Sequence, residues 1–61
     1  MKEQDIVEIL REFKKRSGWS YEKIAREIGV SMLTVQNWIK GKYTPSPLAR
    51  KEIEIFLKRH L

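Results

Sequence analysis

The stretch that decides the fold is WSYEKIAREIGVSMLTVQNWIKGK, residues 19–42. It contains two short segments with apolar residues at helical spacing, and we expect helices at about 21–28 and 32–40. A turn of about three residues that contains Gly29 separates them. Each segment follows a serine at an N-cap position, where a side-chain oxygen accepts a backbone N–H: Ser20 and Ser31. Two short helices joined in this way are the sequence form of a helix-turn-helix.

Four residues in this stretch stand at positions that suit a steep crossing of two helices. Ala25 is small and permits a close approach, and Gly29, four residues later, can take the positive φ that reverses the chain. Val35 and Trp38 are placed to seat the second helix in the core, with Ile39 beside them. The stretch therefore predicts both the turn and the buried side of its second helix.

The flanking sequence predicts two further helices and no strand. The first runs from about residue 3 to 17 and ends at Gly18, which is a favoured residue just past a helix C-terminus. The last spans about 47–59, since Ser46 and Pro47 suit its N-cap and first position. Its expected core stripe, with Ile55 and Leu61 lying to the side, is Leu48, Ala49, Ile53, Phe56 and Leu57. We predict one all-α domain over residues 1–61, a compact bundle of four short helices, or five.

Composition excludes several classes of protein. The 61 residues include no cysteine and one histidine, His60, so we expect no disulfide, metal site or other cofactor. Converging nucleophile and base residues are absent, which argues against an enzyme. No apolar run approaches the roughly 20 residues that cross a bilayer, and no targeting segment is evident. We expect a cytoplasmic protein with no membrane or small-molecule partner.

Charge is distributed unevenly along the chain. The formal net charge is +5, and no acid occurs between Glu27 and Glu52. The cations in that acid-free stretch are Lys40, Lys42, Arg50 and Lys51. A basic patch confined to one region indicates an anionic partner.

In these features the sequence resembles the phage-repressor and Cro superfamily of helix-turn-helix proteins. Residues 19–42 resemble its helix-turn-helix, and the tail GKYTPSPLARKEIEIFLK, residues 41–58, resembles the segment after that motif in small members. The likeness covers roughly residues 3–58 and implies a lambda-repressor-like fold that binds double-stranded DNA, as in a small prokaryotic or phage transcriptional regulator. Many relatives carry a fifth helix or an added C-terminal domain that dimerises or senses a signal, and we expect neither here.

The resemblance also implies a docking geometry. The helix at 32–40 would read the major groove, and the helix at 21–28 would cross the backbone. The residues expected to contact bases are Met32, Leu33, Gln36 and Asn37. Amides can read adenine and apolar groups can meet thymine methyls, so the set favours an A·T-containing half-site. The residues expected to contact phosphates are Ser20, Tyr21, Ser31, Thr34, Lys40, Lys42 and Tyr43.

Each assignment has a plainer alternative. Met32 and Leu33 would also serve a protein-interaction module or an antitoxin-like partner that kept the fold. The amides of Gln36 and Asn37 can be simply solvated. Lys40 and Lys42 can stabilise a helix end, and Tyr21 can serve packing alone. We expect both tryptophans in the core and His60 as a solvated terminal residue. For Lys14–Arg16 we expect helix-end charge, with a contact to DNA as the less favoured alternative. Dimerisation, weak or on DNA only, is a further hypothesis, with Ile55 and Leu61 as its surface.

Overall fold

The computed structural model describes residues 5–60 and contains four helices in that range. They are α1 (Asp5–Ser17), α2 (Tyr21–Ile28), α3 (Met32–Lys40) and α4 (Pro47–His60). No strand occurs between residues 5 and 60, so the all-α class is confirmed. The expected start of the first helix near residue 3 lies outside the described residues, and α4 continues one residue beyond its expected end. None of the four helices is long and apolar enough to cross a bilayer.

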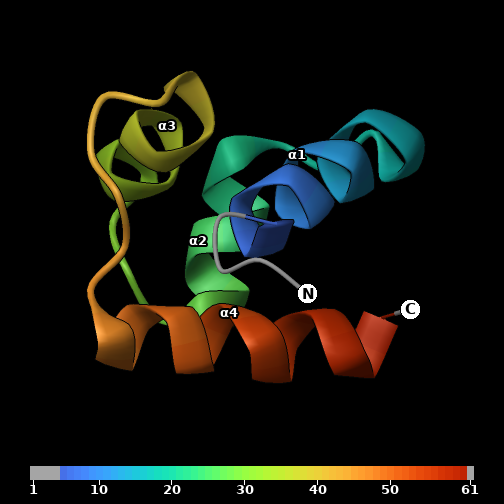
Figure 1. Ribbon diagram of the computed structural model, residues 1–61. Coiled ribbons are helices and arrows are strands. Elements are labelled where there is room, and N and C mark those ends of the chain that lie inside the picture. Colours follow the sequence, from blue (N-terminus) through green and yellow to red (C-terminus); the bar gives the residue numbers. More distant parts are fainter. Residues whose placement is uncertain (1–4, 61) are drawn as a thin grey trace.

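The arrangement places α3 at one edge of the bundle. In Figure 1, α4 runs along the bottom, α1 and α2 lie above it, and α3 stands at the upper left. Helix α3 packs against α2 and α1, and α4 packs against the same two helices. The connection from α3 to α4 runs down the left side of the view. One flank of α3 therefore stays open, since its partners both lie on its inner side.

The core combines one buried side from each helix. Its members, all of them at most 8% exposed, are Leu10, Phe13, Ile24, Ala25, Ile28, Val35, Trp38, Ile53, Phe56 and Leu57. The ring of Phe13 meets Trp19 and Phe56 edge to face, with centroids 5.2 and 5.3 Å apart. Such pairs add to the free energy gained from burial alone. Val35 and Trp38 are buried as the sequence predicts.

His60 is exposed, as expected, but it is not simply a solvated terminal residue. Its ring centroid lies 4.8 Å from that of Phe56 and 5.0 Å from that of Trp19. Because His60 follows Ile53 by seven residues, two helical turns return it to the inner side of α4. The ring therefore extends the aromatic group at the end of the core.

The prediction that Leu48 belongs to the core stripe is wrong, because this residue is 71% exposed. At 100° per residue it lies about 140° around the helix from Ile53, and so on the outer side of α4. The same geometry brings it within about 20° of Ile55, seven residues later, which is 43% exposed. The outer side of α4 therefore carries two exposed apolar side chains two turns apart.

Candidate nucleic-acid interface

The two helices of the expected helix-turn-helix begin at serine caps. Ser20 Oγ accepts the backbone N–H of Lys23 at 3.1 Å, and Ser31 Oγ accepts that of Thr34 at 3.1 Å. Each bond satisfies a helix-terminal N–H that has no partner within the helix. The caps fix where α2 and α3 begin, and they leave only Gly29, Val30 and Ser31 between the two helices.

The turn between α2 and α3 depends on glycine. Gly29 has φ 99°, and its N–H donates to the Ala25 carbonyl at 2.8 Å. No atom lies within 4 Å of where a Cβ would be, so backbone conformation rather than space favours glycine here. Ala25, which is 3% exposed, belongs to the core where α2 packs against α3. This turn holds α3 across α2 with its buried side inward.

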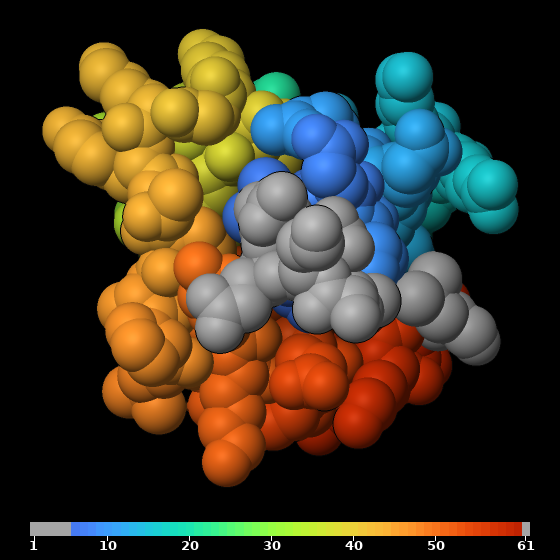
Figure 2. Space-filling model, viewed as in Figure 1, coloured from blue at the N-terminus to red at the C-terminus, as the bar shows by residue number. Residues whose placement is uncertain are grey.

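The outward side of α3 carries the residues expected to contact bases. Met32 and Leu33 are 47% and 62% exposed, and Gln36 and Asn37 are half-buried. By helical geometry Leu33, Gln36, Asn37 and Lys40 share an arc of about 100° on the side away from the core, and Met32 lies about 40° outside that arc. In Figure 2 the atoms of α3 and of the loop after it lie together at the upper left, away from the end of α4. The structure thus brings these side chains onto one exposed surface, which we call the α3 surface.

Two of the expected phosphate-binding hydroxyls are bonded to each other. The Oγ of Ser31 and the Oγ1 of Thr34 lie 2.7 Å apart, and one of them donates to the other. Only one hydroxyl hydrogen of this pair is therefore left for a ligand. Ser20 accepts a bond through its oxygen and keeps its own hydrogen available. Ser20 and Ser31 are exposed, and Thr34 is half-buried.

Tyr21 packs against the core and has a cation beside it. Lys14 Nζ lies 4.4 Å from the centroid of the Tyr21 ring, and both side chains are half-buried. Sequence reasoning favours a helix-end role for Lys14 over a contact with DNA, because a contact across seven residues and two helices leaves no local pattern. The ammonium of Lys14 is thus held at the start of α2, next to the expected phosphate contacts of Ser20 and Tyr21.

The remaining candidates lie at and beyond the end of α3. Lys40, Lys42 and Tyr43 are all exposed, and Gly41 between the lysines takes φ 80°. No ion pair to Lys40 or Lys42 is found within residues 5–60. Four acids of other helices, Glu8, Glu12, Glu22 and Glu54, form ion pairs with cations three or four positions away. The cations beside the α3 surface are therefore not neutralised by these acids.

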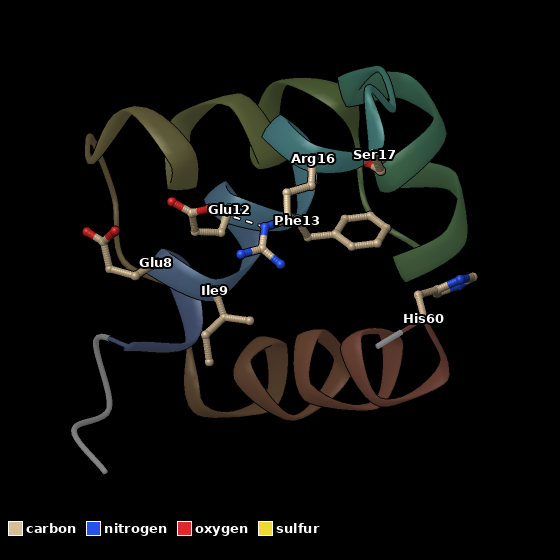
Figure 3. Close-up of a pocket in the computed structure, with 7 residues that line it drawn as sticks. All are labelled: Glu8, Ile9, Glu12, Phe13, Arg16, Ser17 and His60. Carbon is tan, nitrogen blue, oxygen red and sulfur yellow. Dashed lines mark ion pairs between the residues drawn. The ribbon is translucent and has the colours of Figure 1, made fainter.

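A hollow lies elsewhere, between α1 and the end of α4 (Figure 3). It has a volume of about 530 Å³ and is lined by Glu8, Ile9, Glu12, Phe13, Arg16, Ser17 and His60. Its lining is mostly apolar, and Glu12 forms an ion pair with Arg16 at 3.8 Å. None of its lining residues belongs to α2 or α3. Within residues 5–60, no three acid or histidine side chains gather as metal ligands would.

Comparison with known proteins agrees with the geometry. The family model described as "Helix-turn-helix" matches residues 10–61, which is most of the chain. No curated protein and no solved structure gives a match. The match includes α2, the Gly29 turn and α3 in full. The chain belongs to the helix-turn-helix family of DNA-binding regulators, of the phage-repressor and Cro type.

Proposed function

We propose that residues 1–61 act as one domain that binds double-stranded DNA at a preferred sequence, as a small repressor-like transcriptional regulator does. Helix α3 enters the major groove and α2 lies across the backbone. The α3 surface supports this proposal most directly, because it is exposed, contains no acid and combines two amides with two apolar side chains. An anionic duplex favours such a surface, since any carboxylate there would face phosphates.

Specific contacts are proposed from the chemistry of the α3 surface. Gln36 and Asn37 each present an amide that can bond the N6 and N7 atoms of adenine, and Met32 and Leu33 can contact thymine methyls. The proposed phosphate contacts are Ser20, Tyr21, Ser31, Thr34, Lys40, Lys42 and Tyr43. We add Lys14 to these, because its ammonium lies over the Tyr21 ring at the start of α2. Phosphate contacts set the register on the duplex and base contacts select its sequence.

Selection of bound duplexes from a random library, followed by a salt titration, tests this function. We expect enrichment of an A·T-containing half-site. We also expect the logarithm of the binding constant to fall linearly with that of salt, with a slope near −0.9 per phosphate neutralised. Binding that ignores salt, or an absence of binding at low salt, would contradict the proposal.

A protein-interaction module is the alternative, and the exposure of Met32 and Leu33 favours it. Under this alternative the two side chains would bind a protein, such as a toxin partnered by this chain. The acid-free character of the surface gives no advantage in that role. Enrichment of no sequence, together with binding of a protein that Leu33→Ser abolishes, would favour the alternative.

We further propose that two copies bind neighbouring half-sites, either as a weak dimer or after meeting on DNA. A single helix-turn-helix reads about half of an operator. The outer side of α4 offers Ile55, and the exposure of Leu48 adds a second apolar side chain two turns away on the same side. Leu61, the other expected member, lies outside the described residues. We also propose that the protein acts in the cytoplasm, where a regulator of this kind meets its DNA.

A further inference from the structure

At the C-terminal end of α3, one carbonyl is bound by another part of the molecule. The last four carbonyls of a helix have no partner within it. Here the Asn37 carbonyl accepts the N–H of Lys42 at 2.9 Å, and the Trp38 carbonyl accepts that of Gly41 at 3.1 Å. These bonds close the end of the helix through its own backbone. The next carbonyl, that of Ile39, accepts hydrogen bonds from a side chain of α1 instead.

That side chain is Arg11, whose guanidinium bonds on two sides. Its Nε and Nη2 both donate to the Ile39 carbonyl oxygen, at 3.1 and 2.6 Å, across 28 residues of sequence. Its Nη1 lies 2.6 Å from Glu8 Oε2, within α1. All three nitrogens are thus engaged, so the plane of the guanidinium is fixed. By contrast, the serine caps join residues only three apart.

Electrostatics strengthens this link. A hydrogen bond from a charged donor is stronger than one between neutral groups, and a cation at a helix C-terminus is favoured by the helix dipole. The Arg11 side chain is 35% exposed, so water screens it only in part. Lysine offers a point charge and no planar fork, and it cannot reproduce two bonds to one carbonyl together with the ion pair.

Close packing alone does not fix this end of α3. A crevice of about 180 Å³ lies beside Arg11, between α1 and the loop after α3. Its other lining residues are Val7, Glu8, Trp38, Gly41, Tyr43, Thr44, Pro45 and Arg50. Trp38 in the last turn of α3 is 5% exposed and packs in the core, whereas the crevice leaves the side of the turn that faces Arg11 less closely packed. The Arg11 bond therefore adds a restraint on that side of the turn.

We propose that Arg11 is a positioning residue for DNA recognition: it fixes the last turn of α3, and with it Gln36, Asn37 and Lys40, relative to α1. This inference rests on the proposed function. Arg11 contacts no base in this role and acts through the Ile39 carbonyl. Precise placement of these side chains matters because an amide must form two hydrogen bonds to a base edge at once. Phosphate contacts tolerate a shift of the helix end better, since they carry no sequence information.

A pair of charge-preserving substitutions tests the proposal. Arg11→Lys removes the fork, and Arg16→Lys is the matched control, because Arg16 lies in the same helix, also pairs with an acid, and bonds only within α1. On the duplex selected by the wild-type protein, we expect R11K to bind roughly tenfold more weakly, about the loss of one base contact. On random duplex and in salt slope it should match the wild type, and R16K should match it throughout.

Amide exchange of the free protein gives a second, DNA-independent readout. The N–H groups of Gly41 and Lys42 should exchange faster in R11K than in R16K, under conditions where circular dichroism shows all variants folded. If the wild-type protein prefers no DNA sequence, the proposed function fails. The amide exchange rates would still show whether Arg11 fixes the end of α3.

A milder variant guards against loss of the fold in R11K. Glu8→Gln keeps Arg11 but removes the ion pair that orients it, and should reduce the ratio of preferred to random binding in the same direction. An unchanged ratio in the folded variants, a loss that random duplex shares equally, or equal exchange in R11K and R16K would overturn the positioning role.

Discussion

At the residue scale, Asn37 has separate roles for its backbone and its side chain. Its carbonyl oxygen accepts the N–H of Lys42 and so helps to end α3. Its side chain lies in the outward arc of the helix and is half-buried. A change at the side chain therefore leaves the helix cap intact, which makes Asn37 a clean position at which to test base reading.

We expect Asn37→Ala to cost about 1–3 kcal/mol on the preferred duplex and to relax the choice of base at one position. The reason is that a bidentate amide contact to one base pair is lost, while the phosphate contacts stay. Fluorescence anisotropy on the preferred duplex and on its single-base variants measures this. An equal loss on every duplex would show that Asn37 does not read sequence.

Lys42 should behave in the opposite way. Its side chain is exposed beyond the end of α3, where we propose that it contacts a phosphate rather than a base edge. Lys42→Ala should weaken binding to preferred and random duplexes alike and reduce the steepness of the salt dependence by about one unit. Titration at several salt concentrations checks this. A change confined to the preferred duplex would refute the division of labour between Lys42 and Asn37.

Candidate contact residues can be predicted from the sequence where the helical repeat decides which side chains are exposed. Leu33 is exposed and Trp38 is buried because five residues at 100° each place them about 140° apart around one helix. The sequence does not predict Arg11 at the Ile39 carbonyl or Lys14 at Tyr21. Both contacts join helices whose relative placement depends on the packed core, and no periodic pattern encodes that placement.

At the element scale, the bounds of α2 and α3 agree with expectation because their signals are local. A serine cap and a glycine with positive φ act within one turn of the helix end that they define. The core stripe of α4 is less well predicted, because apolar composition alone suggests Leu48. Angular position corrects it, since Ile53, Phe56 and Leu57 define one side and Leu48 lies on the other.

The crossing of α2 over α3 makes Ala25 sensitive to size. Ala25 is 3% exposed, so Ala25→Leu should lower the free energy of unfolding by about 1–3 kcal/mol through overpacking. Urea denaturation followed by circular dichroism measures it. The same change at Ala49, which is only half-buried in α4, is the control and should cost less. Equal costs would mean that the crossing is not tight at Ala25.

The turn between the same helices makes a second prediction. Gly29→Ala should lower the free energy of unfolding by roughly 1–2 kcal/mol, because a Cβ disfavours the left-handed backbone even where there is space for it. Gly29→Asn should cost less, since asparagine tolerates this conformation. The melting temperatures of the two variants, measured by thermal unfolding, test this prediction. If the alanine and asparagine variants had the same melting temperature, the positive φ would not limit which residue this position accepts.

At the scale of the whole molecule, size favours two copies on one operator. The longest extent of the Cα trace is 25 Å, which is shorter than the roughly 34 Å of one DNA turn. Half-sites one turn apart therefore leave room for two copies side by side on one side of a duplex. A small contact between them suffices, because DNA holds both copies close together and raises their effective concentration.

The outer side of α4 is where we expect that contact, so substitutions there should separate dimerisation from DNA reading. Leu48→Gln with Ile55→Gln keeps the net charge and uses a good helix former at two exposed positions. On a duplex with two half-sites one turn apart, sedimentation should show two wild-type copies binding cooperatively and two variant copies binding independently. Binding to a single half-site is the internal control and should be equal for both proteins. Cooperativity that survives the double substitution would place the contact elsewhere, and independent binding by the wild type would contradict dimerisation on DNA.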